Sequence, residues 1–190
     1  MQITIYRVDQ LIIVGFFYAL MKGCDLMSIL QEYEEIRKEL GNGINKGIEL
    51  YLSKNPNLLL SDIYYKEKEY KKFEKWFENY LKPFMTLDCD NEYSLFLDQI
   101  GFDKTIFRTR NKDGIFGNGY DYESLVRTFV AHKLPHLSRE LFYDSENGMF
   151  SVSSYDKKVI EELGFELSQE LRKDKFKDYV SQMESYDFYL

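Results

Sequence analysis

Hydrophobic residues between positions 27 and 82 recur at the spacing of α-helices. A first stripe is predicted to end at Gly41-Asn42-Gly43, a second at Asn55-Pro56-Asn57 and a third at Lys82-Pro83. The apolar positions are Ile29, Tyr33, Ile36 and Leu40 in the first, Ile44, Ile48, Tyr51 and Leu52 in the second, and Tyr70, Phe73, Phe77, Tyr80 and Leu81 in the third. This part of the chain is therefore expected to form a layer of about three helices.

From residue 84 onward, apolar and polar residues alternate in short runs, as they do in β-strands. The dipeptide Asn147-Gly148 lies between two such runs and is typical of a hairpin turn. The predicted strands are residues 93–98, 105–110, 141–144 and 149–152.

Two helices are predicted among these strands. The first carries apolar residues at offsets 0, 3, 4, 7 and 8 from Tyr122, with Asp121 as its expected N-cap and Pro135 at its end. The second begins near Asp156. The element order over residues 84–190 is thus β-β-α-β-β-α, an α+β fold with a small antiparallel sheet.

The first 26 residues differ from the rest because residues 11–21 are uncharged and apolar, although this run is shorter than the roughly 20 residues of a membrane span. Met21-Lys22-Gly23-Cys24 resembles a lipoprotein cleavage box, but a lysine stands where a small or apolar residue belongs. Ser28 and Gln31 fit a helix capping box directly after Met27. These patterns leave open a mis-assigned start or a weak signal-like segment.

Three regions are expected. Residues 1–26 form a non-core extension, residues 27–83 form the helical region, and residues 84–190 form the α+β domain. No repeat or long linker separates the last two, so we expect them to pack as one unit.

Charge and cysteine content narrow the classes of function. The chain has 32 acidic and 25 basic residues, a net charge of −7, which repels nucleic-acid phosphates and is compatible with a basic protein partner. The two cysteines, Cys24 and Cys89, lack the spacing of a zinc site or disulfide scaffold, and they favour the cytoplasm. We expect neither nucleic-acid binding nor membrane binding, unless residues 1–26 are a real signal.

The glycine-rich stretch 114–119 is the main candidate for a cofactor site. It runs GxxGxG rather than GxGxxG, it lacks the Lys-Ser/Thr of a P-loop, and Asp121 would repel an anion at the following helix. We therefore interpret it as a turn that begins a helix, and we expect no cofactor.

The usual catalytic and metal-binding combinations are equally weak. His132 and His136 have metal spacing, but Pro135 lies between them and no third ligand completes the set. Cys89 lies between two aspartates, which raise rather than lower a thiol pKa. No metal and no catalytic residue is assigned, although an enzyme with an unrecognised acid and histidine site stays an alternative.

Aromatic residues are more suggestive, because tyrosine and tryptophan are favoured anchors of protein interfaces. The candidate partner-binding residues are Tyr64, Tyr65, Trp76, Tyr120, Asp121, Tyr122, Asp144 and Glu146.

A run of motifs between residues 117 and 170 resembles the bacterial family called immunity protein 51. These motifs are Gly119-Tyr120-Asp121-Tyr122, Leu134-Pro135, Asp144-Ser145-Glu146, Gly148-Met149-Phe150 and the acid-rich helix from Asp156, with Tyr122 standing where tryptophan is expected. The resemblance implies a non-catalytic antidote of a polymorphic toxin system, which binds and neutralises a cognate toxin. The competing interpretations are the small cytoplasmic enzyme and a membrane-anchored lipoprotein.

Overall fold

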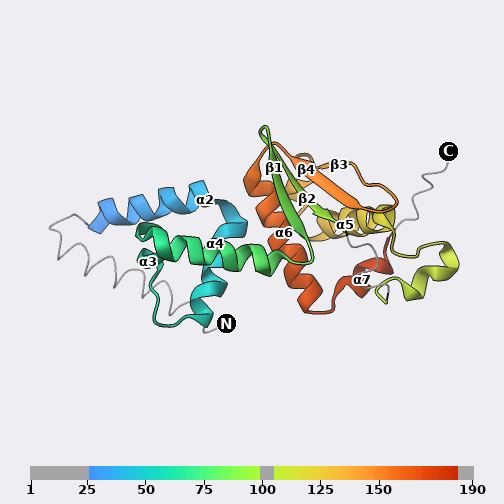
Figure 1. The fold of residues 1–190 in the computed structure, drawn as a ribbon, viewed down its shortest axis with the longest axis horizontal. Coiled ribbons are helices and arrows are strands. Elements are labelled where there is room, and N and C mark those ends of the chain that lie inside the picture. The colour runs from blue at the N-terminus through green and yellow to red at the C-terminus, as the bar shows by residue number, and fades with distance from the viewer. Residues whose placement is uncertain (1–25, 99–104, 184–190) are drawn as a thin grey trace. The chain divides into compact units, whose positions relative to one another are not determined.

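The computed structural model describes residues 26–98 and 105–183, with side chains from Gln31 onward. The chain divides into two compact units, residues 1–73 and 74–190, and helix α4 crosses the boundary (Figure 1). The α+β class is confirmed, since helices at the N-terminal side precede a four-stranded antiparallel sheet. The expected extension 1–26 lies almost wholly outside the described residues, and the packing of 27–83 with 84–190 as one unit stays a prediction.

The first unit is built on helix α2 (Leu26–Lys54), which combines the first two predicted helices. Gly41 interrupts it with φ 75° and ψ 173°, so the predicted stop is a kink rather than a loop. Asn45 repairs the ladder there, because its Nδ2 donates to the carbonyls of Arg37 and Gly41 at 2.6 and 2.7 Å. The short helix α3 (Leu60–Tyr65), which the sequence pattern missed, and the beginning of α4 (Glu67–Leu81) complete this unit.

The second unit contains the sheet, whose strands run in the order β1-β2-β4-β3 with every neighbouring pair antiparallel. The strands are β1 (Met85–Cys89), β2 (Glu92–Leu97), β3 (Phe142–Tyr143) and β4 (Phe150–Ser154). Asp90 and Asn91 join β1 to β2 with φ of 48° and 69°, the left-handed backbone that tight hairpin turns require. The hairpin predicted at Asn147-Gly148 is confirmed by the bridge between Glu146 and Met149.

Helices α5 (Gly119–Lys133) and α6 (Lys157–Arg172) lie on one face of this sheet (Figure 1). Their apolar stripes bury the inward side chains of the central strands, which are Leu95, Leu97, Phe150 and Val152. Gly164 allows the close approach of α6, since a Cβ there would lie 3.1 Å from Leu95 Cδ1. Helix α7 (Phe176–Val180) covers the end of this core against α5.

The predicted strand 105–110 is wrong. The segment is a turn followed by a 3₁₀ helix, η1 (Arg108–Asp113). Adjacent residues of a strand point to opposite faces of the sheet, whereas Ile106 and Phe107 are both buried in the core. Arg110 holds η1 in place by donating from Nη1 to the carbonyls of Val180 and Met183 at 2.9 and 3.1 Å. The order β-β-α-β-β-α nevertheless holds, because β1 supplies the missing strand.

Candidate partner-binding surface

The backbone N–H groups of the glycine-rich stretch are bound by the carboxylate of Asp121, which follows it. Asp121 Oδ2 accepts hydrogen bonds from the backbone N–H groups of Phe116, Gly117 and Asn118 at 2.9, 2.7 and 3.0 Å. Asn118, rather than Asp121, is the N-cap of α5, and its Oδ1 accepts from the Asp121 N–H at 2.9 Å. The amides that a phosphate would use therefore already bind an anion supplied by the chain.

The two glycines of Gly117-Asn118-Gly119 have different structural roles. Gly117 adopts φ 88°, which side-chain-bearing residues rarely do. Gly119 donates its N–H to the Asn147 carbonyl at 3.2 Å, and a Cβ at this position would lie 2.0 Å from the Glu146 carbonyl oxygen. Gly119 thus brings the start of α5 against the backbone of the β3–β4 hairpin.

Tyr122, the last residue of the Gly-Tyr-Asp-Tyr motif, is buried in the core. Its side chain is 2% exposed, and its ring meets the Phe107 ring edge to face at 5.0 Å. The Gly-Tyr-Asp-Tyr element therefore joins a helix, a hairpin and the core, and Tyr122 offers no side-chain surface to a partner in this conformation.

The second face of the sheet carries apolar side chains that reach solvent. Antiparallel partners share a face, and the register aligns Met85 with Phe96 and Ser151 in one row, and Leu87 with Ser94, Ser153 and Phe142 in the next. We call these residues, together with Tyr155, the open sheet face. Leu87, Phe142 and Tyr155 are 52%, 51% and 72% exposed, and the rings of Phe142 and Tyr155 meet at 5.5 Å.

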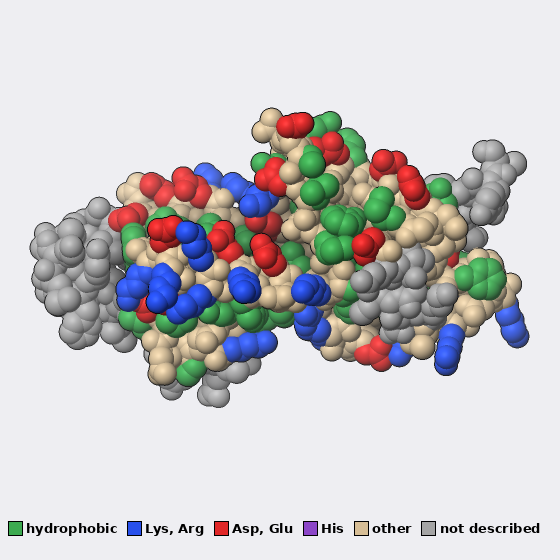
Figure 2. Space-filling model, viewed as in Figure 1, with side chains coloured by type: hydrophobic (Ala, Val, Ile, Leu, Met, Phe, Trp, Pro, Cys, Tyr) green, Lys and Arg blue, Asp and Glu red, His purple; other side chains and the backbone are tan. Residues whose placement is uncertain are grey.

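Acidic residues lie at both ends of the open sheet face. The pairing of Tyr93 with Ser154 and of Leu97 with Phe150 places the two hairpins at opposite ends of the sheet. One end carries Asp90, Glu92 and Asp156, and the other carries Asp98, Asp144 and Glu146. Asp88 pairs with Tyr93 and therefore points to the opposite face of the sheet. Figure 2 shows hydrophobic and acidic side chains gathered over the strands.

The predicted partner-binding residues fall in different places. Tyr120 and Asp121 begin the helix that contacts the β3–β4 hairpin, so they lie near Asp144 and Glu146.

Trp76 is half-buried and stacks on Tyr80 at 5.2 Å. Tyr64 and Tyr65 belong to the first unit. The exposed apolar residues of the open sheet face were missed, because they come together only through strand pairing.

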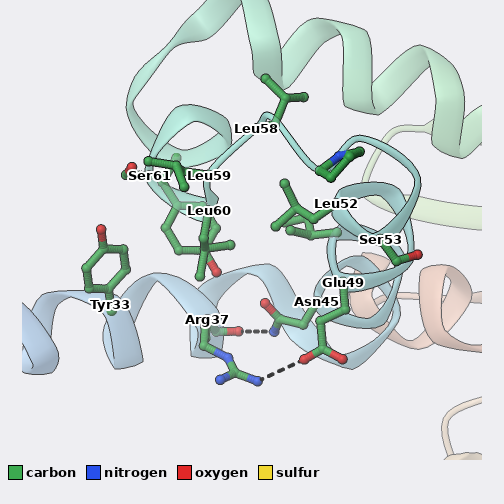
Figure 3. A pocket seen from close by; sticks show the side chains of 13 residues that line it. Tyr33, Arg37, Asn45, Glu49, Leu52, Ser53, Leu58, Leu59, Leu60 and Ser61 are labelled. Atoms are coloured by element: carbon green, nitrogen blue, oxygen red, sulfur yellow. Dashed lines mark hydrogen bonds and ion pairs between the residues drawn. The ribbon is translucent and has the colours of Figure 1, made fainter. Parts of the chain in front are cut away.

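The first unit contains a cavity of about 340 Å³ between α2 and α3 (Figure 3). Tyr33, Asn45, Leu52 and Tyr64 are among its lining residues, and Arg37 pairs with Glu49 at 3.6 Å at its side. Burial raises the pKa of Tyr64 to about 12, which keeps this hydroxyl neutral. Tyr65 lies outside the lining and donates to Glu32 Oε1 at 2.9 Å.

Buried acids of the second unit have structural partners. Glu123 receives hydrogen bonds from Arg127, Glu162 lies 3.4 Å from His136 Nε2, and Glu170 pairs with the Lys173 ammonium at 3.1 Å. Across residues 26–98 and 105–183, no three His, Cys, Asp or Glu side chains cluster as a metal ion requires. None of the helices within those ranges combines the length and hydropathy needed to cross a bilayer.

Comparison with known proteins adds one finding. Residues 84–184 match the family model described as Immunity protein 51, which covers more than half of the chain. The resemblance carried by residues 117–170 is therefore confirmed and extends to β1 at one end and beyond α7 at the other. No curated protein and no solved structure matches the chain.

Proposed function

We propose a function from one premise: this chain belongs to the Immunity protein 51 family, whose model covers residues 84–184. The chain is a non-catalytic immunity protein that binds a cognate bacterial toxin in the cytoplasm and blocks it by occupying a surface the toxin needs. Family membership is the observation that carries this proposal.

The use of the family motif supports binding rather than catalysis. Each residue of the motif has a structural role: Gly119 allows the close approach of the hairpin backbone, Asp121 accepts hydrogen bonds from backbone N–H groups, and Tyr122 packs in the core. A scaffold fixed in this way can present a surface with little rearrangement, which lowers the entropic cost of association.

The test is protection of a host cell. A toxin domain identified in the reading frame next to this one should arrest growth when expressed alone, and co-expression of the chain should restore growth. The purified pair should elute as one stoichiometric complex in size-exclusion chromatography. Continued arrest, together with separate elution of the two proteins, would refute the proposal.

An enzymatic mode of protection has a distinct outcome. An enzyme that modifies the toxin would protect at a small fraction of the toxin concentration, whereas an inhibitor must match it. Titrating the purified chain into a toxin activity assay should therefore give an end point at about one chain per toxin, as tight stoichiometric binding requires.

A further inference from the structure

We propose that the open sheet face and its acidic ends form the surface that receives the toxin, and that the toxin presents a basic surface with apolar side chains that contact Leu87 and Phe142. This inference rests on the proposed function and adds the location and chemistry of the interface.

Charge distribution is the first argument. Residues 85–98 and 141–156, which contain all four strands and both hairpins, hold seven acidic residues and no lysine, arginine or histidine. Seven of the 32 acidic residues lie there, so the remainder of the chain holds 25 acidic and 25 basic residues and is formally neutral. The net charge of −7 therefore equals the formal charge of these two segments, the second of which ends at Asp156, directly before Lys157 and Lys158.

Apolar exposure on the same surface is the second argument. Leu87 on β1 and Phe142 on β3 stand on the two edge strands, while Ser94, Ser151 and Ser153 occupy the central strands between them. Protein interfaces commonly combine exposed apolar and aromatic anchors with polar and charged residues around them. On the open sheet face Leu87 and Phe142 flank the central serines, and carboxylates lie at both ends of the strands.

The charge also selects among possible occupants. A second copy of this chain would bring the six acidic residues at the ends of the open sheet face against the same six, and nucleic acid or an anionic membrane would meet the same repulsion. A basic protein is attracted along the whole surface, and opposite charge raises its rate of encounter. The occupant is therefore a protein of positive surface charge.

The test uses the full-length chain and the purified toxin domain against which the chain protects cells, with association and dissociation followed by biolayer interferometry. The double variant Glu92→Lys/Glu146→Lys, with one change at each end of the open sheet face, should slow association about tenfold or more at low salt. Its matched control is Glu74→Lys/Glu78→Lys, which makes the same change in net charge at exposed positions of α4. The control should stay within about twofold of the unmodified chain.

The apolar anchors on the two edge strands are tested separately. Leu87→Thr/Phe142→Thr should raise Kd about 10- to 100-fold, chiefly through faster dissociation, because a few apolar anchors dominate the affinity of a protein interface. Leu59→Thr removes an exposed leucine outside residues 84–184 and should leave Kd unchanged. Far-UV circular dichroism and the urea midpoint verify that each variant folds.

The outcomes separate the two proposals. If the unmodified chain does not bind the toxin domain, the proposed function fails. If it binds while both sheet variants bind equally well, the function stands and the assignment of this face is overturned. The assignment is also overturned if the α4 control slows association as much as the sheet variant, because total charge then accounts for the effect.

Discussion

The absence of one side chain sets how closely helix α5 approaches the β3–β4 hairpin. At Gly119 a Cβ atom would lie 2.0 and 2.3 Å from the carbonyl oxygens of Glu146 and Met149, distances that require backbone movement. Both carbonyls belong to the hairpin that contributes acids to one end of the open sheet face. The lack of a side chain at Gly119 therefore fixes the position of a hairpin that belongs to the proposed interface.

Gly119→Ala should lower the free energy of unfolding by about 2–4 kcal/mol, because the helix and the hairpin must separate. Gly148→Ala is the control, since no atom lies within 4 Å of its Cβ position, and it should change stability by less than about 0.5 kcal/mol. Urea unfolding of both variants measures the difference. Equal stability of the two would contradict this account of Gly119.

Asp121 is the second residue on which this region depends. Asp121→Ala leaves three N–H groups without their acceptor and should lower the free energy of unfolding by about 1–3 kcal/mol. Asp121→Asn keeps an acceptor oxygen but loses the charge near the helix N-terminus, so its effect should be smaller. Thermal or urea unfolding gives the order, and an alanine variant as stable as the asparagine variant would show that the oxygen is unimportant.

Glu161 on α6 should make stability depend on pH. Burial raises its pKa from 4.5 to about 7, although the Lys157 ammonium at 3.6 Å acts in the opposite direction. The folded state then holds this proton more tightly than the unfolded state. The stability from this group is complete below pH 4.5 and is lost as the pH rises through 7.

Glu161→Gln should therefore match the unmodified chain at about pH 4 and exceed its free energy of unfolding by about 1–3 kcal/mol at about pH 8. Urea unfolding at both values measures the gap. A gap of the same size under acidic and alkaline conditions would mean that ionisation of this carboxyl does not contribute.

At the scale of elements, the 3₁₀ helix η1 connects distant parts of the second unit. Arg110 reaches the carbonyls of Val180 and Met183, which follow it by 70 and 73 residues. Both of those residues are buried, so a single guanidinium links η1 to the end of the core that α7 covers.

Arg110→Ala should release α7 and lower the free energy of unfolding by about 1–3 kcal/mol. Amide hydrogen exchange should rise over residues 176–183 and change little in the hairpins. Arg108→Ala, an exposed neighbour in the same 3₁₀ helix, is the control and should leave both measurements unchanged. Unaltered exchange in the Arg110 variant would remove its proposed role.

Elements that expose one side and bury the other could be predicted from the sequence. Helices α5 and α6, strand β2 and the β3–β4 hairpin all show a regular spacing of apolar residues. Strand β1 was missed although Met85, Leu87 and Cys89 alternate with Thr86 and Asp88, and its apolar positions lie on the open sheet face rather than in the core. Residues 105–110 misled the prediction because two adjacent apolar residues, Ile106 and Phe107, are buried by tertiary packing rather than by a strand.

The candidate interface was harder to predict for the same reason. Tyr64, Tyr65 and Trp76 attract attention as aromatic residues, whereas Leu87 and Phe142 are ordinary until the register brings β1 and β3 to the edges of one sheet. Pairing between residues about 60 positions apart, as between Ser94 and Ser153, cannot be read from local spacing.

At the scale of the whole molecule, the confinement of excess charge to the sheet has a kinetic consequence. The association of the toxin domain with the chain should be strongly dependent on salt, because exposed charges are screened within about 10 Å at 0.1 M ionic strength. Raising NaCl from about 20 to 500 mM should lower the association rate about tenfold or more and change the dissociation rate much less. Stopped-flow fluorescence measures both, and an association rate independent of salt would argue against a basic partner.

Core-facing and outward-facing residues alternate along each strand, and this alternation bears on how members of the family diversify. Leu95 and Val152 point into the core, while Leu87 and Phe142 on the edge strands point the other way and are about half exposed, so these outward positions can be replaced without repacking the interior. The Gly-Tyr-Asp signature, seated between helix and hairpin, then identifies the scaffold and says nothing about its target. If the open sheet face receives the partner as proposed, two members of the family with the same signature are expected to bind different toxins, and exchange of the exposed outward residues of the strands is expected to transfer this specificity between them.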